Sequence, residues 1–243
     1  MKILITGALG HIGSHLISNI YKYDKIKKIF LVDNFESKKY NILFKIKNKK
    51  FQFIYGDLTK KNFVMNLPKV NQVIHLASIT DVEKSFSETK RIFQNNIGCF
   101  NNVVKYCIKN KSKLIHISST SVYGSPKKIV DEKSILNPQS PYAKIKMREE
   151  IILRNSKKLK YITLRFGTIS GYSDGMNFHT AINKFCFNAV MKIPIPIWGE
   201  ALNIKRPYLS INDAYKVIKH IFRNDMYDNN TYNILSENKT KAE

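Results

Sequence analysis

The sequence predicts an α/β fold, in which a doubly wound parallel sheet is followed by a smaller C-terminal region. Three observations predict it. Short apolar segments recur along the chain and alternate with stretches of helical periodicity. A glycine-rich turn joins the first apolar segment to the first helical stretch. The residues with candidate chemistry come directly after apolar segments, where the carboxyl ends of parallel strands meet and ligands bind.

The first predicted strand, Lys2–Ile5, leads through the turn TGALGHIG (residues 6–13) into a helix. Glycines in this turn let the backbone approach a pyrophosphate closely, and the helix offers unpaired N–H groups and a positive dipole end. The spacing G-x-x-G-x-x-G differs from the commoner G-x-G-x-x-G. By itself, therefore, the turn is weak support for a dinucleotide site.

The second predicted strand, Ile29–Val32, ends at Asp33, about twenty residues after Gly13. A carboxylate at this place accepts a hydrogen bond from a ribose hydroxyl and repels a 2′-phosphate. The next residue, Asn34, is neutral, and no arginine stands beside it. The pattern favours NAD over NADP, although a role of Asp33 in capping a turn would explain the same residue.

Four more strands extend the predicted sheet. Apolar residues at three- and four-residue steps from Phe93 to Ile108 predict a helix after the fourth strand, with Cys107 on its buried face. Strands that alternate with helices form right-handed β-α units, so the predicted sheet is Rossmann-like. These strands are Phe51–Tyr55, Asn71–Leu76, Leu114–Ile117 and Tyr161–Leu164.

The candidate catalytic set lies between the fifth and sixth strands. Tyr142 and Lys146 are four residues apart on one face of a predicted helix, in which Pro141 suits the first position and Ser140 the cap. A free tyrosine has a pKa of about 10, and a nearby ammonium or nicotinamide cation favours its phenolate. The hydroxyl of Ser119, after the fifth strand, can form a hydrogen bond with the reacting oxygen of a substrate. Alone, the Tyr-x-x-x-Lys pattern is equally consistent with a solvated helix face.

Beyond Arg165 the alternation of strands and helices loosens. This predicts a smaller C-terminal region, which ends soon after a strand at Thr231–Leu235. Trp198, within this region, is expected to be a packing anchor.

The composition is that of an ordinary globular protein, with 43% hydrophobic and 24% charged residues. The formal net charge of +23, from 41 basic and 18 acidic residues, could indicate a polyanionic partner. The lysines, however, are spread along every segment, and no basic stripe is interleaved with aromatic residues. Binding of nucleic acid is therefore not expected as the main function.

Three cysteines, Cys99, Cys107 and Cys186, lack the spacing of a zinc site or a disulfide framework, so no metal is expected. No run approaches 18 apolar residues, and glycines interrupt the apolar start of the chain. The sequence therefore predicts a cytoplasmic protein with no membrane partner.

Several stretches, in the same order, carry a family resemblance: TGALGHIG, VDNF, GDL, HLAS followed by DVEKS, SSTSVYG, SPYAKIK, LRFGTISG and KRPYLSINDA. Over nearly the whole chain they resemble the extended short-chain dehydrogenase/reductase family, in particular its NAD-dependent nucleotide-sugar epimerases and dehydratases. The resemblance implies NAD as cofactor and a nucleotide sugar as substrate. It also implies an NAD-binding domain in residues 1–165 and a smaller substrate-binding region in residues 166–243, together with a homodimer.

The resemblance assigns roles by position. The turn at residues 6–13 would hold the pyrophosphate, Asp33 the adenosine ribose, and Arg206 the substrate diphosphate, although Arg206 also suits a surface ion pair. The implied catalytic residues are Ser119, Tyr142 and Lys146. The implied cofactor-binding residues are Gly7, Gly10, His11, Ile12, Gly13, Asp33, Asn34, Asp57, Leu58, Ala77, Asn96, Tyr142 and Lys146. The implied substrate-binding residues are Ser119, Thr120, Thr168, Asn177 and Arg206.

Departures from the family pattern bear on the reaction. Dehydratases of the family carry an Asp-Glu pair where this chain has Thr120 and Ser121, which argues against dehydration. An epimerase with Tyr142 as base is therefore expected, with a reductase or dehydrogenase, or a non-catalytic dinucleotide-binding protein, as alternatives. Most members also run past the length of this chain, so contacts from that further segment cannot be assigned, and the sequence does not specify the sugar or the nucleotide.

Overall fold

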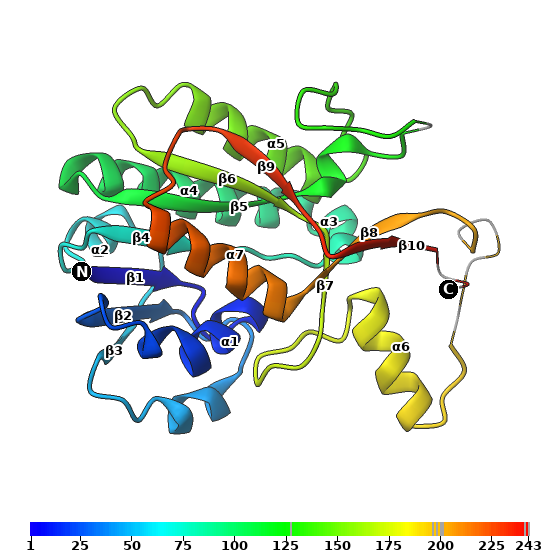
Figure 1. Cartoon of the computed structure of the whole chain (residues 1–243), viewed down its shortest axis with the longest axis horizontal. Helices are drawn as coiled ribbons and strands as arrows, with labels where there is room; N and C mark the ends of the chain where they lie inside the picture. The colour runs from blue at the N-terminus through cyan, green and yellow to red at the C-terminus, as the bar shows by residue number, and fades with distance from the viewer. Residues whose placement is uncertain (127, 196, 198, 200–201, 241, 243) are drawn as a thin grey trace.

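The computed structural model describes residues 1–126, 128–195, 197, 199, 202–240 and 242. A seven-stranded parallel sheet lies between two layers of helices, and a three-stranded sheet lies beyond the carboxyl ends of its strands (Figure 1). The predicted α/β class and the Rossmann-like parallel sheet are confirmed. Trp198, expected as a packing anchor, lies outside the described residues.

The large sheet has the strand order β3-β2-β1-β4-β5-β6-β9, and all neighbouring strands in it are parallel. The chain winds outward from β1 to β3 and then starts again at β4, on the other side of β1. Such a reversal leaves a crevice at the carboxyl ends of the two central strands. The strands are β1 (Lys2–Thr6), β2 (Lys28–Asp33), β3 (Phe51–Tyr55), β4 (Gln72–His75), β5 (Lys113–Ser119), β6 (Tyr161–Phe166), β7 (Thr168–Ser170), β8 (Arg206–Ser210), β9 (Thr231–Ile234) and β10 (Glu237–Lys239).

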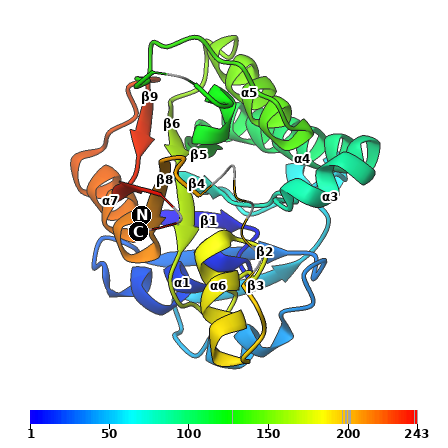
Figure 2. The ribbon, with the colours of Figure 1, turned by 90° about the vertical axis from the view of Figure 1, so that its right-hand side faces the viewer.

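Helices cover both faces of the large sheet. On one face α1 packs against α7, and on the other α4 packs against both α2 and α5 (Figure 2). The α-helices are α1 (His11–Asn19), α2 (Lys61–Met65), α3 (Val82–Ser87), α4 (Thr89–Asn110), α5 (Pro141–Arg154), α6 (Ala181–Val190) and α7 (Ile211–Asn224), and the 3-10 helices are η1 (Ile20–Lys22), η2 (Tyr40–Lys45) and η3 (Thr120–Tyr123).

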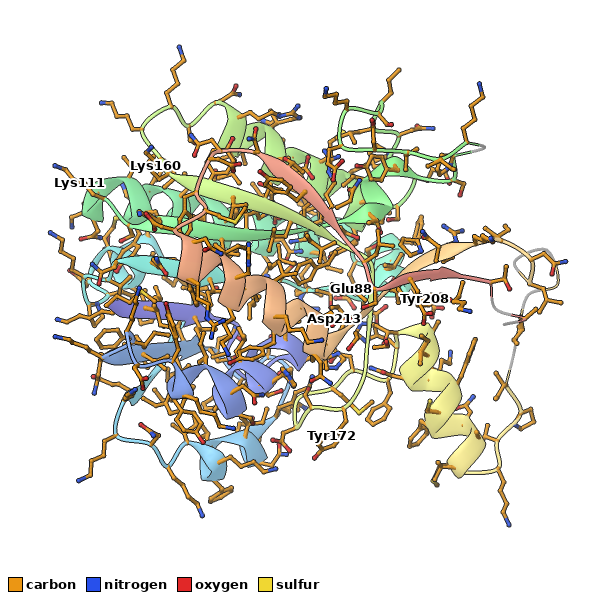
Figure 3. All side chains as sticks on the ribbon, viewed as in Figure 1. Glu88, Lys111, Lys160, Tyr172, Tyr208 and Asp213 are labelled. Carbon is orange, nitrogen blue, oxygen red and sulfur yellow. The ribbon has the colours of Figure 1, made fainter. Side chains whose placement is uncertain are left out.

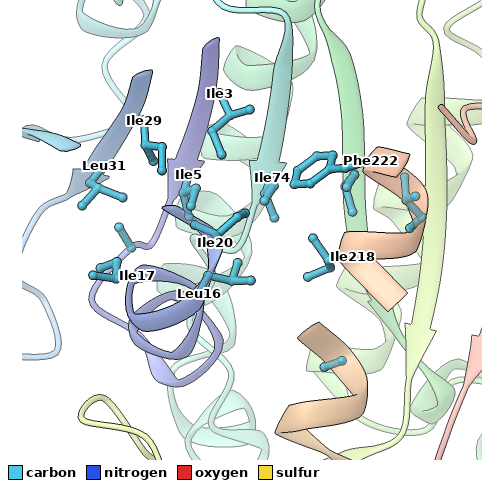
Figure 4. Packing of buried hydrophobic residues seen from close by; sticks show 14 of the residues in the cluster. Ile3, Ile5, Leu16, Ile17, Ile20, Ile29, Leu31, Ile74, Ile218 and Phe222 are labelled. Carbon is cyan, nitrogen blue, oxygen red and sulfur yellow. The ribbon is translucent and has the colours of Figure 1, made fainter. Parts of the chain in front are cut away.

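The two-residue period of the strands divides the core into two clusters. On β1, Ile3 and Ile5 point into the cluster beneath α1 and α7, whereas Leu4 points into the cluster beneath α4. Figure 4 shows the first cluster, in which Leu16 of α1 and Ile218 of α7 approach the strands. Because both faces are covered, most strand residues are apolar, which explains why short apolar runs predicted the strands; His116 of β5 and Arg165 of β6 are buried polar exceptions.

The C-terminal part of the chain contributes to both sheets. The small sheet has the order β10-β8-β7, whereas α7 packs against α1 and β9 adds the outermost strand of the large sheet beside β6. The predicted division into residues 1–165 and 166–243 therefore does not coincide with the boundary of the large sheet, and it stays a prediction. The predicted strand Thr231–Leu235 is confirmed as β9, one residue shorter.

Basic side chains occur at the end of the sheet away from the crevice. Lys111, after α4, and Lys160, before β6, lie at the amino-terminal edge of the strands, and Glu88 and Tyr208 lie toward the opposite edge (Figure 3).

Within the described ranges, no helix has the length and apolar character needed to cross a membrane.

Candidate active site

A crevice of about 320 Å³ opens at the carboxyl ends of β1, β2 and β4, where the winding of the sheet reverses. Predicted residues from four separate segments line it together. They include Gly7 and Gly10 of the glycine turn, Asp33 and Asn34 after β2, Leu58 after β3, and Ala77 after β4. The fold therefore brings together much of the predicted cofactor set.

The glycine turn is close to β4, so a side chain could not be added to it. Gly7 has a φ of +63°, and a Cβ on it would lie 2.7 Å from backbone atoms of Ala77. A Cβ on Gly13 would lie 2.4 Å from the carbonyl oxygen of Ala8. These contacts explain the spacing G-x-x-G-x-x-G: the first and third glycines allow the turn and the helix to pack closely.

The Thr6 hydroxyl fixes the floor of the crevice by joining the ends of β1 and β4. It accepts hydrogen bonds from the backbone N–H groups of Leu76 and Ala77, at 3.2 and 3.3 Å, so its own proton points to Nδ1 of His75 at 2.8 Å. Burial lowers the pKa of His75 to about 3, which keeps the imidazole neutral. The sequence did not indicate this bracing.

Asp33 caps the glycine turn and also lines the crevice. Its carboxylate accepts hydrogen bonds from the backbone N–H groups of Leu9 at 3.0 Å and Phe35 at 2.9 Å, which ties the glycine turn to the end of β2. The same residue lines the crevice. A carboxylate has further lone pairs, so capping the turn leaves acceptors for a ribose hydroxyl.

A loop from the C-terminal part of the chain, residues 171–177, rests on the glycine turn. A Cβ on Gly175 would lie 2.5 Å from the carbonyl oxygens of Leu9 and Gly10, so the two backbones are in direct contact. Ser14 and Ser173 join the same two segments by a hydroxyl–hydroxyl bond of 3.1 Å.

Lys39 ties the same loop to the segment after β2. Its ammonium donates to the Gly175 carbonyl and to Oδ1 of Asn177, both at 2.5 Å, and both Lys39 and Asn177 line the crevice. The loop therefore closes one side of the crevice.

The residues present fit a dinucleotide. Within the described part of the chain, the buried hydroxyl of Ser78 has no hydrogen-bond partner, and Ser78 lines the crevice. A buried hydroxyl without a partner is unfavourable unless a ligand satisfies it. Together with the closely packed glycine turn, which admits a phosphate to backbone N–H groups, Ser78 indicates a polar ligand of the size and kind of NAD.

The predicted catalytic residues Ser119, Tyr142 and Lys146 are not among the described residues that line the crevice; they come from β5, which pairs with β4, and from α5, which packs against β5. Ser119 is the last residue of β5, and Tyr142 and Lys146 lie on α5. The predicted helix start is confirmed: Pro141 is in the first turn, and the Ser140 hydroxyl accepts from the N–H of Ala143 at 3.1 Å. The Lys146 ammonium lies 5.9 Å from the centre of the Tyr142 ring.

Ser119 has a hydroxyl partner of its own. Its Oγ accepts hydrogen bonds from the N–H of Ser121 at 3.2 Å and lies 2.9 Å from the Ser121 hydroxyl. Because the oxygen accepts from its neighbour, the proton of Ser119 is free to point to a substrate oxygen.

A buried ion pair holds Lys146. Its Nζ donates to Oε2 of Glu149 at 2.8 Å, and the same oxygen accepts from Nε2 of His116 at 3.0 Å. The side chains of Lys146 and Glu149 are only 5% and 1% exposed. Burial would raise the pKa of Glu149, but the Lys146 ammonium and the His116 bond outweigh it and lower this pKa to about 2.

The pKa of Tyr142 differs from the expected direction. Burial raises it, the Lys146 ammonium lowers it, and the Glu149 carboxylate raises it again, with a net shift upward. The sequence indicated the contribution of the ammonium correctly, but it did not reveal the carboxylate behind that ammonium. In the protein alone, therefore, the hydroxyl of Tyr142 is held protonated.

Next to this pair, Glu150 is clamped by Arg165 of β6. The guanidinium donates from Nε at 2.9 Å and from Nη2 at 2.7 Å, and the Ser118 hydroxyl adds a bond of 2.6 Å. This bidentate pair joins α5 to the sheet at the level of the catalytic residues.

Several predicted cofactor residues lie behind the crevice surface. Asn96 is fully buried, and its amide bonds to both the N–H and the carbonyl of Ile79, while its neighbour Asn95 lines the crevice. Asp57 accepts from the N–H and hydroxyl of Thr59, both at 2.8 Å. Both residues shape loops whose other residues face the crevice.

His11 and Ile12 belong to the start of α1. Burial lowers the pKa of His11 to about 4, so the ring is neutral and its Nε2–H donates to the Gly171 carbonyl at 2.8 Å. Ile12 packs against the core beneath α1. Neither lines the crevice within the described part of the structure.

The remaining predicted substrate residues are more spread out. The Thr120 hydroxyl donates to the Phe166 carbonyl at 3.3 Å, and Thr168 begins β7. Arg206 is exposed at the start of β8, away from the residues that line the crevice. The structure therefore brings Asn177 to the crevice and leaves Arg206 at the surface of the small sheet.

Comparisons with known proteins agree with this geometry. The family model for the NAD dependent epimerase/dehydratase family matches residues 3–234. A dTDP-D-glucose 4,6-dehydratase of Dictyostelium discoideum is 32% identical over 96% of this chain, which spans 58% of the length of that relative.

Solved structures extend the likeness. A UDP-glucuronic acid 4-epimerase of Bacillus cereus, in complex with UDP-glucuronic acid and NAD, is 28% identical with a TM-score of 0.84, covering 99% of this chain and 79% of the other. A dTDP-glucose 4,6-dehydratase of Streptomyces venezuelae, solved with NAD, has the same fold at a TM-score of 0.90 and 21% identity, covering 99% and 78%. With its glycine turn, its crevice and its tyrosine–lysine helix, the chain belongs to the NAD-dependent epimerase/dehydratase family.

Proposed function

We propose that the protein epimerises a nucleotide-diphosphate sugar through a transient keto intermediate, with Tyr142 as the base. The observation that carries the proposal is the placement of Tyr142 and Lys146 together on α5, which packs against β5 and η3, the elements that hold Ser119 and the hydroxyl side chains of Thr120 and Ser121. The similar proteins include dehydratases and epimerases. The residues at positions 120 and 121 favour epimerisation.

The absence of carboxylates at positions 120 and 121 is the argument against dehydration. Eliminating water from a sugar requires a group that removes a proton from carbon and a group that protonates the leaving hydroxyl. The Thr120 hydroxyl is directed to the Phe166 carbonyl, and the Ser121 hydroxyl to Ser119. Hydroxyl groups with ordinary acidity cannot take either role at neutral pH.

In the proposed mechanism Tyr142 moves the proton. Its phenolate, which the Lys146 ammonium and the positive charge of a bound nicotinamide would favour, removes the proton of a sugar hydroxyl, while the Ser119 hydroxyl donates a hydrogen bond to the same oxygen. The glycine turn and Asp33 would hold NAD, which would supply a reversible hydride acceptor for the sugar carbon. Tyr142 then returns the proton to the oxygen. If the keto sugar rotates in the site between loss and return of the hydride, so that its opposite face receives the hydride, the product has the inverted configuration at that carbon.

Substrate binding is proposed for Asn177, which lines the crevice, and for Thr120, Thr168 and Arg206, which are not among the described lining residues. Asn177, held by Lys39, would contact the sugar or nucleotide, and Thr120 and Thr168 would line the sugar site. Arg206 would bind the diphosphate, for which the two-pronged guanidinium is suited. The chain spans 58% of the length of the Dictyostelium relative, and the proposed substrate class is a nucleotide-diphosphate sugar.

Product analysis tests the proposal. The purified protein is incubated with NAD and a panel of UDP and dTDP sugars, and the sugars are followed by NMR. We expect an epimer to form with no net production of NADH, and Tyr142→Phe to form it far more slowly, by a factor on the order of 10² to 10⁴. Net oxidation of NADH with a reduced sugar would identify a reductase instead, and NAD binding without turnover of any sugar would identify a non-catalytic dinucleotide-binding protein.

We also propose a homodimer in which α4 and α5 of two copies pair. The two helices lie side by side, and Phe93 on α4 is 46% exposed, so their outer surface retains apolar area. A monomeric mass in solution at micromolar concentration would contradict this arrangement.

A further inference from the structure

Glu149 places a buried negative charge one helical turn after Lys146. The Lys146 ammonium lies between the Tyr142 ring, at 5.9 Å from its centre, and the Glu149 carboxylate, at 2.8 Å. His116 of β5 donates to the same carboxylate oxygen, so Glu149 is held from the sheet as well as from its own helix. Because both Lys146 and His116 donate to Glu149, its carboxylate stays beside the Lys146 ammonium.

The other groups around this pair carry no charge that could replace Glu149. Burial lowers the pKa of His75 to about 3, lowers that of His116, and raises that of Cys99 to about 12, so all three are neutral near pH 7. Glu150 is matched by Arg165. In the described part of the structure, the groups that face Lys146 or Glu149 are Tyr142, Glu150, His75 from β4, His116 from β5 and Cys99 from α4, while Glu83 on the neighbouring α3 is exposed.

We propose that Glu149 is a positioning residue of the Tyr142–Lys146 pair: its carboxylate holds the Lys146 ammonium in place and offsets part of the positive charge that acts on the Tyr142 hydroxyl. The inference rests on the proposed function for the role of Tyr142 in turnover. The charge effect itself belongs to the protein alone and can be measured without a substrate.

The direction of the effect follows from electrostatics. Opposite charges act on the phenolate of Tyr142: the ammonium stabilises it and the carboxylate destabilises it. Glu149→Gln keeps the length and an acceptor oxygen for Lys146 and His116, but it removes the negative charge. The phenolate then faces an uncompensated ammonium, so the pKa of Tyr142 falls.

A titration of the phenolate by ultraviolet absorbance reads this change directly. The contribution of Tyr142 is obtained by subtracting the titration of Tyr142→Phe made in the same background. We expect Glu149→Gln to move the midpoint about 1 pH unit downward, as for a charge within several ångströms of a titrating group. Glu83→Gln, which removes an exposed carboxylate from α3, is the matched control and should leave the midpoint in place.

The pH dependence of turnover is the second readout. The acidic limb of the rate profile of Glu149→Gln should lie at lower pH than that of the unaltered protein, by the same amount as the absorbance midpoint. A Glu149→Gln protein with an unmoved midpoint, or with lower activity at every pH and an unshifted limb, would overturn the proposal and leave Glu149 a structural residue.

Glu149→Asp covers the case in which Glu149→Gln does not fold. It retains the charge but withdraws it by one methylene, so a smaller downward shift of the Tyr142 midpoint is expected, and no shift would overturn the proposal. If no nucleotide sugar is turned over at all, the proposed function fails, but the absorbance titration still decides the role of Glu149.

Discussion

Glu149 and Glu150 are neighbours on α5, both are buried, and their partners are of different kinds. Glu150 receives two bonds from the planar guanidinium of Arg165, whereas Glu149 receives one bond from the compact ammonium of Lys146. A guanidinium fork fixes a carboxylate in one orientation, while an ammonium keeps further donors for other acceptors. Under the proposed function, the Arg165 pair would serve the scaffold and the Lys146 pair would serve the chemistry.

The largest expected effect is on the chemical side of this comparison. Tyr142→Phe keeps the packing of the ring and removes only the ionisable oxygen, so turnover should fall by a factor on the order of 10² to 10⁴. Steady-state kinetics with the substrate found by product analysis measure this fall. Melting temperature and NAD affinity are the controls, and both should be unchanged. Turnover at the original rate would end the role of Tyr142 as the base.

Lys146→Ala should combine both kinds of effect. Turnover should fall at least as far as in Tyr142→Phe, because the charge that favours the phenolate is lost. Stability should fall as well, because Glu149 is left buried and unpaired, which costs about 3–5 kcal/mol in other proteins. Kinetics and denaturant unfolding on the same sample separate the two losses. In the double variant Lys146→Ala/Glu149→Gln, stability should recover and turnover should not. This result would show that the loss of stability comes from the buried Glu149 charge and the loss of turnover from the missing ammonium.

On the scaffold side, Arg165→Ala should destabilise the protein by about 3–5 kcal/mol, since it leaves the Glu150 carboxylate buried without its partner. Urea unfolding measures the change. The matched control is Lys216→Ala, which removes an ion pair with Asp213 at the surface and should have a much smaller effect. Equal losses in the two variants would contradict the clamp.

Acid should weaken the fold in two steps. The folded pKa of His75, about 3, lies below its unfolded value, so the unfolded chain takes up more protons and stability falls as pH drops below about 6.5. The folded pKa of Glu149, about 2, is also depressed, so its contribution is present above about 4.5 and is lost as pH falls toward 2. Unfolding measured at a series of pH values should show both steps, and Glu149→Gln should flatten the second.

The smallest expected effect is that of Ser119→Ala. It removes one hydrogen bond to the reacting oxygen and leaves the base in place, so a loss of about tenfold in turnover is expected, equivalent to about 1.4 kcal/mol. The loss should appear in kcat rather than in stability. A loss as large as that of Tyr142→Phe would mean that Ser119 does more than share the oxygen.

Local patterns in the sequence predicted much of the fold and of the site. Each predicted strand of the large sheet is present within two residues of its expected ends, because strands covered on both faces are mostly apolar. The start of α5 was predicted from Ser140 and Pro141, whose contributions depend only on their immediate neighbours. The glycine turn and the position of Asp33 were predicted in the same way, because each directly follows a predicted strand.

What the sequence did not predict depends on contacts between distant segments. The pairing of His116 with Glu149 joins a strand to a helix, and nothing in the local pattern of either shows it. The direction of the Tyr142 pKa was missed for the same reason. Asn96 was expected at the cofactor, but its amide is occupied by the Ile79 backbone, which only the path of the chain after β4 reveals.

The contact between Gly175 and the turn at Leu9 and Gly10 limits how this protein can be re-engineered. A Cβ at position 175 would lie within 2.5 Å of both carbonyl oxygens, so the loop and the turn fit only as a matched pair. Replacing residues 171–177 with the corresponding loop of a relative would alter the surface against which the glycine turn rests. An exchange of this loop between relatives would therefore have to include the glycine turn, residues 6–13, as well.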